Sequence, residues 1–221
     1  MPASIPSLRF HFLTPYYDFL FRLLLPEKKI RQKLLHLGNL TDAENILEIG
    51  CGTGSFTLML AAKFPDLSIT AVDPDRRALS ILSAKIAQKS LSKIKPVQAS
   101  ATALPLADES VQAVFSSLLF CNLSHHQKIK TIMEARRVLQ HNGRFLIAEW
   151  GKPQTFVGRL GFTILQWVGG KANTNDIKKG ALVHYLISAK FSVSSGIFVN
   201  TLFGTVWFYE VAKTNHPPQE L

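Results

Sequence analysis

The sequence predicts an α/β fold with parallel strands, because a buried strand, a glycine-rich loop and a helix follow one another over residues 46–63. Residues 46–54 read Ile-Leu-Glu-Ile-Gly-Cys-Gly-Thr-Gly, an apolar run that ends in three alternate glycines. Such a run is typical of a strand buried on both faces of a sheet. Residues 55–63 continue with helical character, so the loop would present helix N-terminal N–H groups to a ligand. We therefore expect a nucleotide-type site here.

The spacing of the glycines narrows the class of ligand. The dinucleotide fingerprint G-x-G-x-x-G requires a glycine where Ser55 stands, and the Gly-Lys-Ser/Thr of a P-loop does not occur. Glu48 precedes Gly50 by two residues. A carboxylate there disfavours a pyrophosphate and favours a ligand that carries a free ammonium group or hydroxyls.

An acidic residue after the second apolar run supports the same kind of site. The apolar run over residues 67–72 is followed directly by Asp73, which lies nineteen residues after Gly54. Nucleotide-binding folds place an acid here to accept hydrogen bonds from ribose hydroxyls. The alternative role is the N-cap of a helix over residues 76–89, but Asp75 can supply that cap. We therefore expect Asp73 to bind a ribose.

Composition is typical of one globular domain. Of 221 residues, 47% are hydrophobic and 18% are charged. Cys51 and Cys121 do not form a disulfide framework, which favours a reducing, cytoplasmic setting. The net charge of +10 lies mostly outside residues 41–151. A basic face suits anionic lipid, nucleic acid or an acidic substrate, and general solubility is the alternative.

Two apolar stretches have the wrong properties for membrane insertion. Residues 19–25 are short, contain Arg22 and lack a small-residue cleavage site, so they do not resemble a signal peptide. Residues 191–209 carry too many polar residues and glycines for a lipid-facing helix. Two strands joined by a turn, 191–199 and 204–213, explain this segment better. We expect no transmembrane segment.

The N-terminal segment is aromatic and basic. Residues 5–37 are expected to form two helices, broken near Pro15 and Pro26, with an amphipathic stripe made of Tyr17, Leu20, Phe21, Leu24 and Leu25. One interpretation is a helix that covers an edge of the sheet. The other is a cap over the ligand that also touches a membrane or an apolar substrate.

The fourth predicted strand, 111–119, brings further residues to the ligand edge. Ser116 and Leu118 fall at its carboxyl end, where open α/β sheets bind ligands. His125 and His126 follow, but no matching cluster of Cys or His accompanies them, so we expect no metal. Ser124 is expected to cap the next helix, and His125 to contact a substrate at the rim of the site.

Three segments resemble motifs of class I S-adenosylmethionine-dependent methyltransferases. The E-x-G-x-G-x-G pattern over residues 48–54 is similar to motif I of this family. Residues 100–110 resemble the family's D-A-x-x-L-P-F-x-D-x-S segment, with Ser100 in place of the first Asp. Residues 134–149 resemble E-x-x-R-V-L-K-P-G-G followed by a strand. Here Asn142-Gly143 is expected to provide the positive-φ positions of the turn. Residues 200–206 and the Tyr17-Asp18 pair resemble the subgroup of ubiquinone/menaquinone and phospholipid methyltransferases.

The resemblance implies a Rossmann-like sheet of seven mostly parallel strands in the order 3-2-1-4-5-7-6. Strand 7 would be antiparallel, and helices would cover both faces. Within a single domain, 1–221, it implies an N-terminal helical cap at 1–40, a cofactor-binding core at 41–151, a substrate-side insertion at 152–190 and a closing hairpin at 191–213.

The implied cofactor is S-adenosyl-L-methionine, with S-adenosyl-L-homocysteine as product. Glu48 and Gly50 would hold its amino-acid end, and Ser100 and Ala101 would lie by the adenine. The complete predicted cofactor site is Tyr17, Glu48, Gly50, Cys51, Gly52, Gly54, Asp73, Pro74, Ser100, Ala101, Ser116 and Leu118. His125 and Trp150 are the predicted acceptor contacts. The general base stays open among His125, Tyr16, Tyr17, Glu149, His184 and Tyr185.

The expected activity is methyl transfer to a small, lipophilic or membrane-derived acceptor, with peripheral membrane contact through the basic and aromatic segments. Methylation of nucleic acid or of another small molecule is the alternative. No Asn/Asp-Pro-Pro-Tyr motif and no appended RNA-binding module support a nucleic-acid substrate. A non-catalytic relative that binds S-adenosylmethionine and acts as a partner protein is the third hypothesis.

Overall fold

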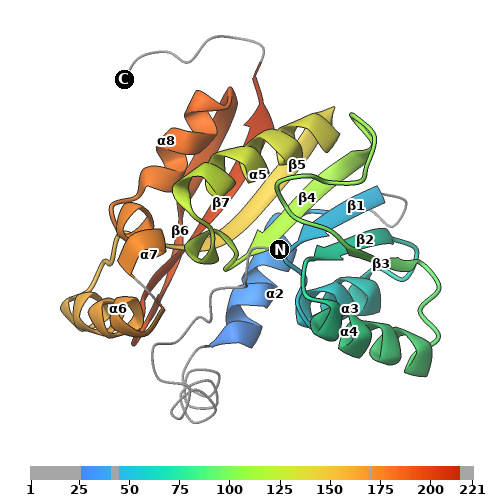
Figure 1. The fold of residues 1–221 in the computed structure, drawn as a ribbon, viewed down its shortest axis with the longest axis horizontal. Coiled ribbons are helices and arrows are strands. Elements are labelled where there is room, and N and C mark those ends of the chain that lie inside the picture. Colours follow the sequence, from blue (N-terminus) through green and yellow to red (C-terminus); the bar gives the residue numbers. More distant parts are fainter. Residues whose placement is uncertain (1–25, 41–44, 170, 215–221) are drawn as a thin grey trace.

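A seven-stranded sheet in the order β3-β2-β1-β4-β5-β7-β6 forms the centre of the molecule (Figure 1). The computed structural model describes residues 26–40, 45–169 and 171–214. All pairs are parallel except those of β7, which runs antiparallel to β5 and β6. The strands are β1 Asn45–Ile49, β2 Ser68–Asp73, β3 Ile94–Gln98, β4 Val111–Ser117, β5 Leu139–Gly151, β6 Phe191–Thr201 and β7 Gly204–Lys213. The predicted order is confirmed.

Helices lie between the strands and cover both faces of the sheet. They are α2 Glu27–Leu37, α3 Ser55–Lys63, α4 Arg76–Gln88, the 3₁₀ helix η1 Phe120–Asn122, α5 His125–Val138, α6 Phe156–Gly169, α7 Lys171–Lys178 and α8 Ala181–Ser188. None of the helices in the described part is both long and apolar enough to cross a bilayer.

Alternation along the strands directs neighbouring side chains to opposite faces of the sheet. Phe115 of β4 packs against Phe56 of α3, with ring centroids 5.4 Å apart. Phe145 of β5 lies beside Val114 in the sheet register and packs instead against Phe191. Helices α5 and α8 cover this second face (Figure 1). The central strands are therefore apolar on both sides, as their sequences predicted.

The second predicted N-terminal helix is α2, which packs against β5 and β7. Lys33 of α2 lies over the ring of Phe208 at 5.7 Å. This helix therefore covers part of one face of the sheet, whereas the simpler of the two interpretations placed it at an edge, which β3 and β6 form. Residues 1–25, including Tyr16, Tyr17 and the predicted stripe, lie outside the described residues, so the cap over the cofactor stays a prediction.

The prediction of a turn with positive φ values at Asn142-Gly143 is wrong. Neither residue has a positive φ, because β5 begins at Leu139 and continues through them, with a register shift against β4 between Val111 and Ala113. A Cβ on Gly143 would lie 2.6 Å from Leu139 Cδ1 and 2.9 Å from the carbonyl oxygen of Gln112. Close packing, and not backbone conformation, requires glycine here.

Candidate functional site

The glycine loop joins β1 to α3 at the carboxyl edge of the sheet. Gly50, Gly52 and Gly54 have φ values of +76°, +53° and +78°, in the left-handed region that glycine adopts without strain. A Cβ on Gly54 would lie 2.2 Å from Leu82 Cδ1, whereas one on Gly52 would meet nothing within 4 Å. The loop is thus packed against α4 at one end and open above Gly52.

Asp73 connects this loop to the end of β2. Its Oδ2 accepts a hydrogen bond from the Gly52 N–H at 2.8 Å, and its Oδ1 accepts one from the Asp75 N–H at 2.9 Å. Asp75 caps α4 through the N–H groups of Arg77 and Ala78, as predicted. The half-buried carboxylate of Asp73 has lone pairs left for the two hydroxyls of a ribose. These residues therefore fit a nucleoside-type cofactor.

Glu48 lies beneath the glycine loop. Its side chain is 3% exposed, and its Oε2 accepts a hydrogen bond from Thr57 Oγ1 at 2.5 Å. Burial raises the pKa of Glu48 to about 7, against the opposing effects of the Thr57 hydrogen bond and the charge of Arg31. The carboxyl group holds α3 to β1, and its predicted contact with the amino-acid end of the cofactor stays a prediction.

The segment after β4 lies against the glycine loop. A Cβ on Gly50 would be 3.0 Å from Leu119 Cδ1, and Leu118 has a φ of +55°. Ser116 is 1% exposed, and its Oγ has no hydrogen-bond partner among the described residues. Ser116 and Leu118 are therefore at the carboxyl edge of the sheet, as their place in the sequence predicted.

The residues predicted to border the adenine lie after β3. Ser100 is exposed and its Oγ lies 2.8 Å from Thr102 Oγ1, whereas Ala101 is buried. Pro74 accepts a hydrogen bond through its carbonyl from Gln98 Nε2 at 3.3 Å. This bond links the end of β3 to the Asp73 turn.

Glu149 positions the segment after β4, a role that sequence reasoning missed. Its buried carboxylate accepts hydrogen bonds from the N–H groups of Phe120 at 2.6 Å and Trp150 at 2.8 Å. Burial raises the pKa of Glu149 to about 7, although these backbone donors act in the opposite direction. Cys121 lies beside it, and burial followed by the charge of Glu149 raises the pKa of this thiol well above its usual range.

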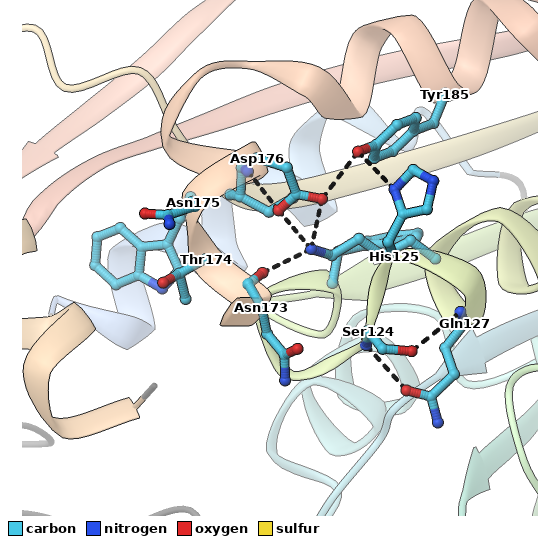
Figure 2. A network of polar contacts seen from close by, with 12 residues as sticks. Ser124, His125, Gln127, Asn173, Thr174, Asn175, Asp176 and Tyr185 are labelled. Atoms are coloured by element: carbon cyan, nitrogen blue, oxygen red, sulfur yellow. Dashed lines mark hydrogen bonds and ion pairs between the residues drawn. The ribbon is translucent and has the colours of Figure 1, made fainter. Parts of the chain in front are cut away.

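A polar network joins α5, α7 and α8 next to this edge (Figure 2). Lys128 is fully buried, and its Nζ donates to both carboxylate oxygens of Asp176, at 2.7 and 2.9 Å, and to the Asn173 carbonyl at 2.6 Å. The Tyr185 hydroxyl donates to Asp176 Oδ2 at 3.0 Å and lies 3.0 Å from His125 Nδ1. Burial, followed by the hydrogen bond to Asp176, raises the pKa of Tyr185 to about 12.

Two of the candidate bases, His125 and Tyr185, are therefore in contact with each other, whereas Glu149 lies in the core. Ser124 caps α5 with a capping box completed by Gln127, as predicted (Figure 2). Sequence reasoning missed Lys128 and Asp176 as partners. The only signal in the sequence was a lysine on the face of α5 that otherwise carries Thr131, Ile132, Ala135 and Val138.

Trp150 has a packing role. It is 3% exposed, and its ring meets that of Phe162 edge-on, with centroids 6.0 Å apart. A Cβ on Gly204 would lie 3.4 Å from this ring. The predicted acceptor contact is not open to solvent in this arrangement. Across residues 26–40, 45–169 and 171–214, no three His, Cys, Asp or Glu side chains gather as a metal site would require.

Comparisons with known proteins agree with this geometry. A family model described as a methyltransferase domain matches residues 46–143. Demethylmenaquinone methyltransferase from Thermotoga maritima is 32% identical over 157 residues, which cover 69% of this chain and 66% of that protein. The protein of the same name from Thermus thermophilus is 29% identical over 170 residues, covering 74% and 76%. The chain thus spans about two thirds to three quarters of these relatives' lengths.

Solved structures show the same fold. The crystal structure of a SAM-dependent methyltransferase from Aquifex aeolicus matches with a TM-score of 0.64 at 18% sequence identity. The match covers 88% of this chain and 97% of the Aquifex chain. Together with the glycine loop, the Asp73 contact and the strand order, these similarities establish the family. The chain belongs to the class I S-adenosylmethionine-dependent methyltransferases.

Proposed function

We propose that the protein transfers a methyl group from S-adenosylmethionine to a small lipophilic acceptor of the quinol type. The observation that carries this proposal is the hydrogen bond between the Gly52 N–H and Asp73 at the carboxyl ends of β1 and β2. It holds an open loop beside a carboxylate with free lone pairs. The relatives named for demethylmenaquinone support the class of acceptor.

The cofactor supplies, when bound, a methyl group on a sulfonium, which needs little further activation. Asp73 would accept hydrogen bonds from the ribose, Gly52 would allow close approach, and Ser100 and Ala101 would border the adenine. The enzyme's remaining tasks are alignment of the acceptor and exclusion of water. Transfer to a ring carbon breaks the S–CH₃ bond, forms a C–CH₃ bond and releases the ring proton.

The acceptor would enter on the side of α6 and α7, which follow the carboxyl end of β5. Phe156, Val157 and Leu160 of α6 are exposed apolar side chains on this side. A lipophilic acceptor resides in the bilayer, so we place the enzyme in the cytoplasm and at the periphery of the membrane. His125, at the N-terminus of α5 and in contact with Tyr185, is the candidate proton acceptor on this side, because the raised pKa of Tyr185 keeps its hydroxyl protonated.

Calorimetric titration of S-adenosylmethionine tests the cofactor site. We expect micromolar binding by the wild type and at least about tenfold weaker binding by Asp73→Ala, because charge-assisted hydrogen bonds to two hydroxyls are lost. Asp75→Ala is the matched control. It removes the α4 cap, costs about 1 kcal/mol of stability and leaves the affinity within about twofold. Equal loss in both variants would contradict the ribose assignment.

Transfer of a labelled methyl group to demethylmenaquinol with a shortened tail then tests the acceptor class. Labelled lipid-extractable product, absent in Asp73→Ala, supports the proposal. Tight cofactor binding without transfer to quinols, phospholipids or amines would favour a non-catalytic partner protein instead. Transfer to RNA or DNA, but not to quinols, would show that the acceptor is a nucleic acid and not a lipophilic small molecule.

A further inference from the structure

Helix α6 presents an apolar face to solvent. Phe156, Val157 and Leu160 are 81%, 56% and 62% exposed. Their spacing of i, i+1 and i+4 places them on one side of a helix. Most large apolar side chains elsewhere in the described part are buried, so a cluster of this exposure on a single helix indicates an interaction surface.

The contacts of two glycines in α6 explain why this face points outward. A Cβ on Gly161 would lie 1.8 Å from the Leu202 carbonyl oxygen, and one on Gly158 would lie 3.4 Å from the Gly204 Cα. The two glycines thus let the helix backbone rest directly on the turn between β6 and β7. Leu202 in that turn is itself 52% exposed. The β6–β7 turn and α6 lie at the periphery of the molecule (Figure 1), so Leu202 extends the apolar surface of the helix.

A basic pocket lies beside this apolar surface. Its volume is about 550 Å³, and it is lined by Lys152, Pro153, Arg159, Asn175, Lys178 and Lys179. Four of these six side chains are cationic and none is acidic. Residues 150–209 contain six Lys or Arg but a single acidic residue, Asp176. Because Asp176 is already paired with Lys128, the charge of the pocket is not neutralised locally.

We propose that the apolar surface of α6 and the β6–β7 turn docks on a phospholipid bilayer, with the basic pocket binding anionic headgroup phosphates. Apolar side chains flanked by cations are the combination that binds the boundary between acyl chains and headgroups. Each cation near an anionic leaflet adds favourable electrostatic energy, and Arg and Lys pair strongly with phosphate oxygens. Charge complementarity selects an anionic bilayer over a neutral one.

The docking surface would place the acceptor side of the enzyme against the membrane. Its biological purpose therefore rests on the proposed function. Pro153 and Lys152 follow directly after β5, whose carboxyl end borders the candidate site. Docking through α6 would therefore orient this edge of the sheet toward the bilayer. The surface lies outside the segments at residues 5–37 that the sequence alone indicated for membrane contact.

Co-sedimentation with vesicles tests the proposal. We expect the wild type to bind phosphatidylglycerol/phosphatidylcholine vesicles, to bind pure phosphatidylcholine poorly and to dissociate as salt rises. Phe156→Ser with Leu160→Ser should weaken vesicle binding by at least about tenfold through lost apolar burial. Arg159→Glu with Lys179→Glu should do the same through lost charge.

Two matched controls use exposed residues away from this surface. Ile81→Ser with Met133→Ser replaces apolar side chains that are 48% and 52% exposed on α4 and α5. Lys89→Glu with Lys130→Glu makes the same change of charge. Both should leave vesicle binding within about twofold. Equal loss in the controls and in the α6 variants would overturn the proposal, since the effect would then be general.

Further outcomes separate the alternatives. Binding of inorganic phosphate or pyrophosphate to the pocket, together with vesicle binding that is insensitive to Phe156→Ser and Leu160→Ser, would indicate a soluble anion and overturn docking. A concentration-dependent dimer that these substitutions abolish, without vesicle binding, would assign the surface to a second copy of the chain. Loss of vesicle binding in the α6 and pocket variants, with their S-adenosylmethionine affinity unchanged, would support docking. Failure of methyl transfer with docking intact would refute only the proposed function.

Discussion

The buried ion pair between Lys128 and Asp176 leads to an asymmetric stability prediction. Lys128 has a side-chain exposure of 0%, whereas that of Asp176 is 22%. Asp176→Asn would leave a fully buried ammonium group without a counter-charge. Removal of one member of a buried pair in this way costs about 3–5 kcal/mol. Lys128→Met leaves a carboxylate that still reaches water.

The remaining contacts of Asp176 set the smaller cost of Lys128→Met. Its carboxylate would keep the hydrogen bonds from the Tyr185 hydroxyl at 3.0 Å and from the Ile177 N–H at 2.8 Å. Methionine would fill much of the volume of the lysine stem. We therefore expect a loss of about 2 kcal/mol for Lys128→Met, smaller than for Asp176→Asn, because the Asn173 carbonyl and the Asp176 carboxylate both lose their hydrogen bonds from Nζ.

Urea denaturation at pH 7 of both single variants and of the double variant measures the two costs and their coupling. Burial acts to raise the pKa of Asp176, but the hydrogen bond and the charge of Lys128 outweigh it and leave that pKa below its usual value. The stabilisation from the pair is therefore present above the usual pKa of an aspartate and is lost as the pH falls below it. A Lys128→Met cost equal to or larger than that of Asp176→Asn would refute the reasoning.

Two further predictions concern Glu149 and Ser100. Burial raises the pKa of Glu149 from 4.5 to about 7, so its contribution to stability is complete below pH 4.5 and is lost as the pH rises through 7, by about 3 kcal/mol in total. The pKa of Glu48 is raised to the same value, so the two groups contribute about equally to the fall in the wild type's unfolding free energy between pH 4.5 and 8. Glu149→Gln should therefore remove about half of that fall, measured by urea denaturation at several pH values. An unchanged dependence of the unfolding free energy on pH would contradict this. Ser100→Asp introduces the acid typical of the family at a position predicted to border the adenine. It should tighten S-adenosylmethionine binding in calorimetry by about three- to tenfold through a charge-assisted hydrogen bond, whereas weaker binding would place the adenine elsewhere.

Features determined by a few neighbouring residues could be predicted from the sequence. The alternate glycines and the apolar run before them specify the loop, and Asp75 and Ser124 stand where helices begin. In each case the hydrogen-bond donor and acceptor lie within three residues of each other. The resemblance to the methyltransferase family added the strand order. Asn142-Gly143 shows the limit of local signals, because close contact with Leu139 and Gln112 overrode a familiar turn pattern.

Features that depend on distant residues were decided by the tertiary structure. Lys128 and Asp176 are 48 residues apart, and no local pattern couples a lysine on one helix to an acid on another. The polar residues of α6 recur at i, i+4 and i+7, as Arg159, Thr163 and Gln166, so periodicity alone would turn that side to solvent. The structure instead buries Gln166 and exposes Phe156 and Leu160. The sequence by itself determined the strands, the glycine loop and the helix caps, because short-range sterics and hydrogen bonds specify them. Packing of Gly158 and Gly161 on the β6–β7 turn decided which side of α6 meets solvent, because only the folded chain brings these segments into contact.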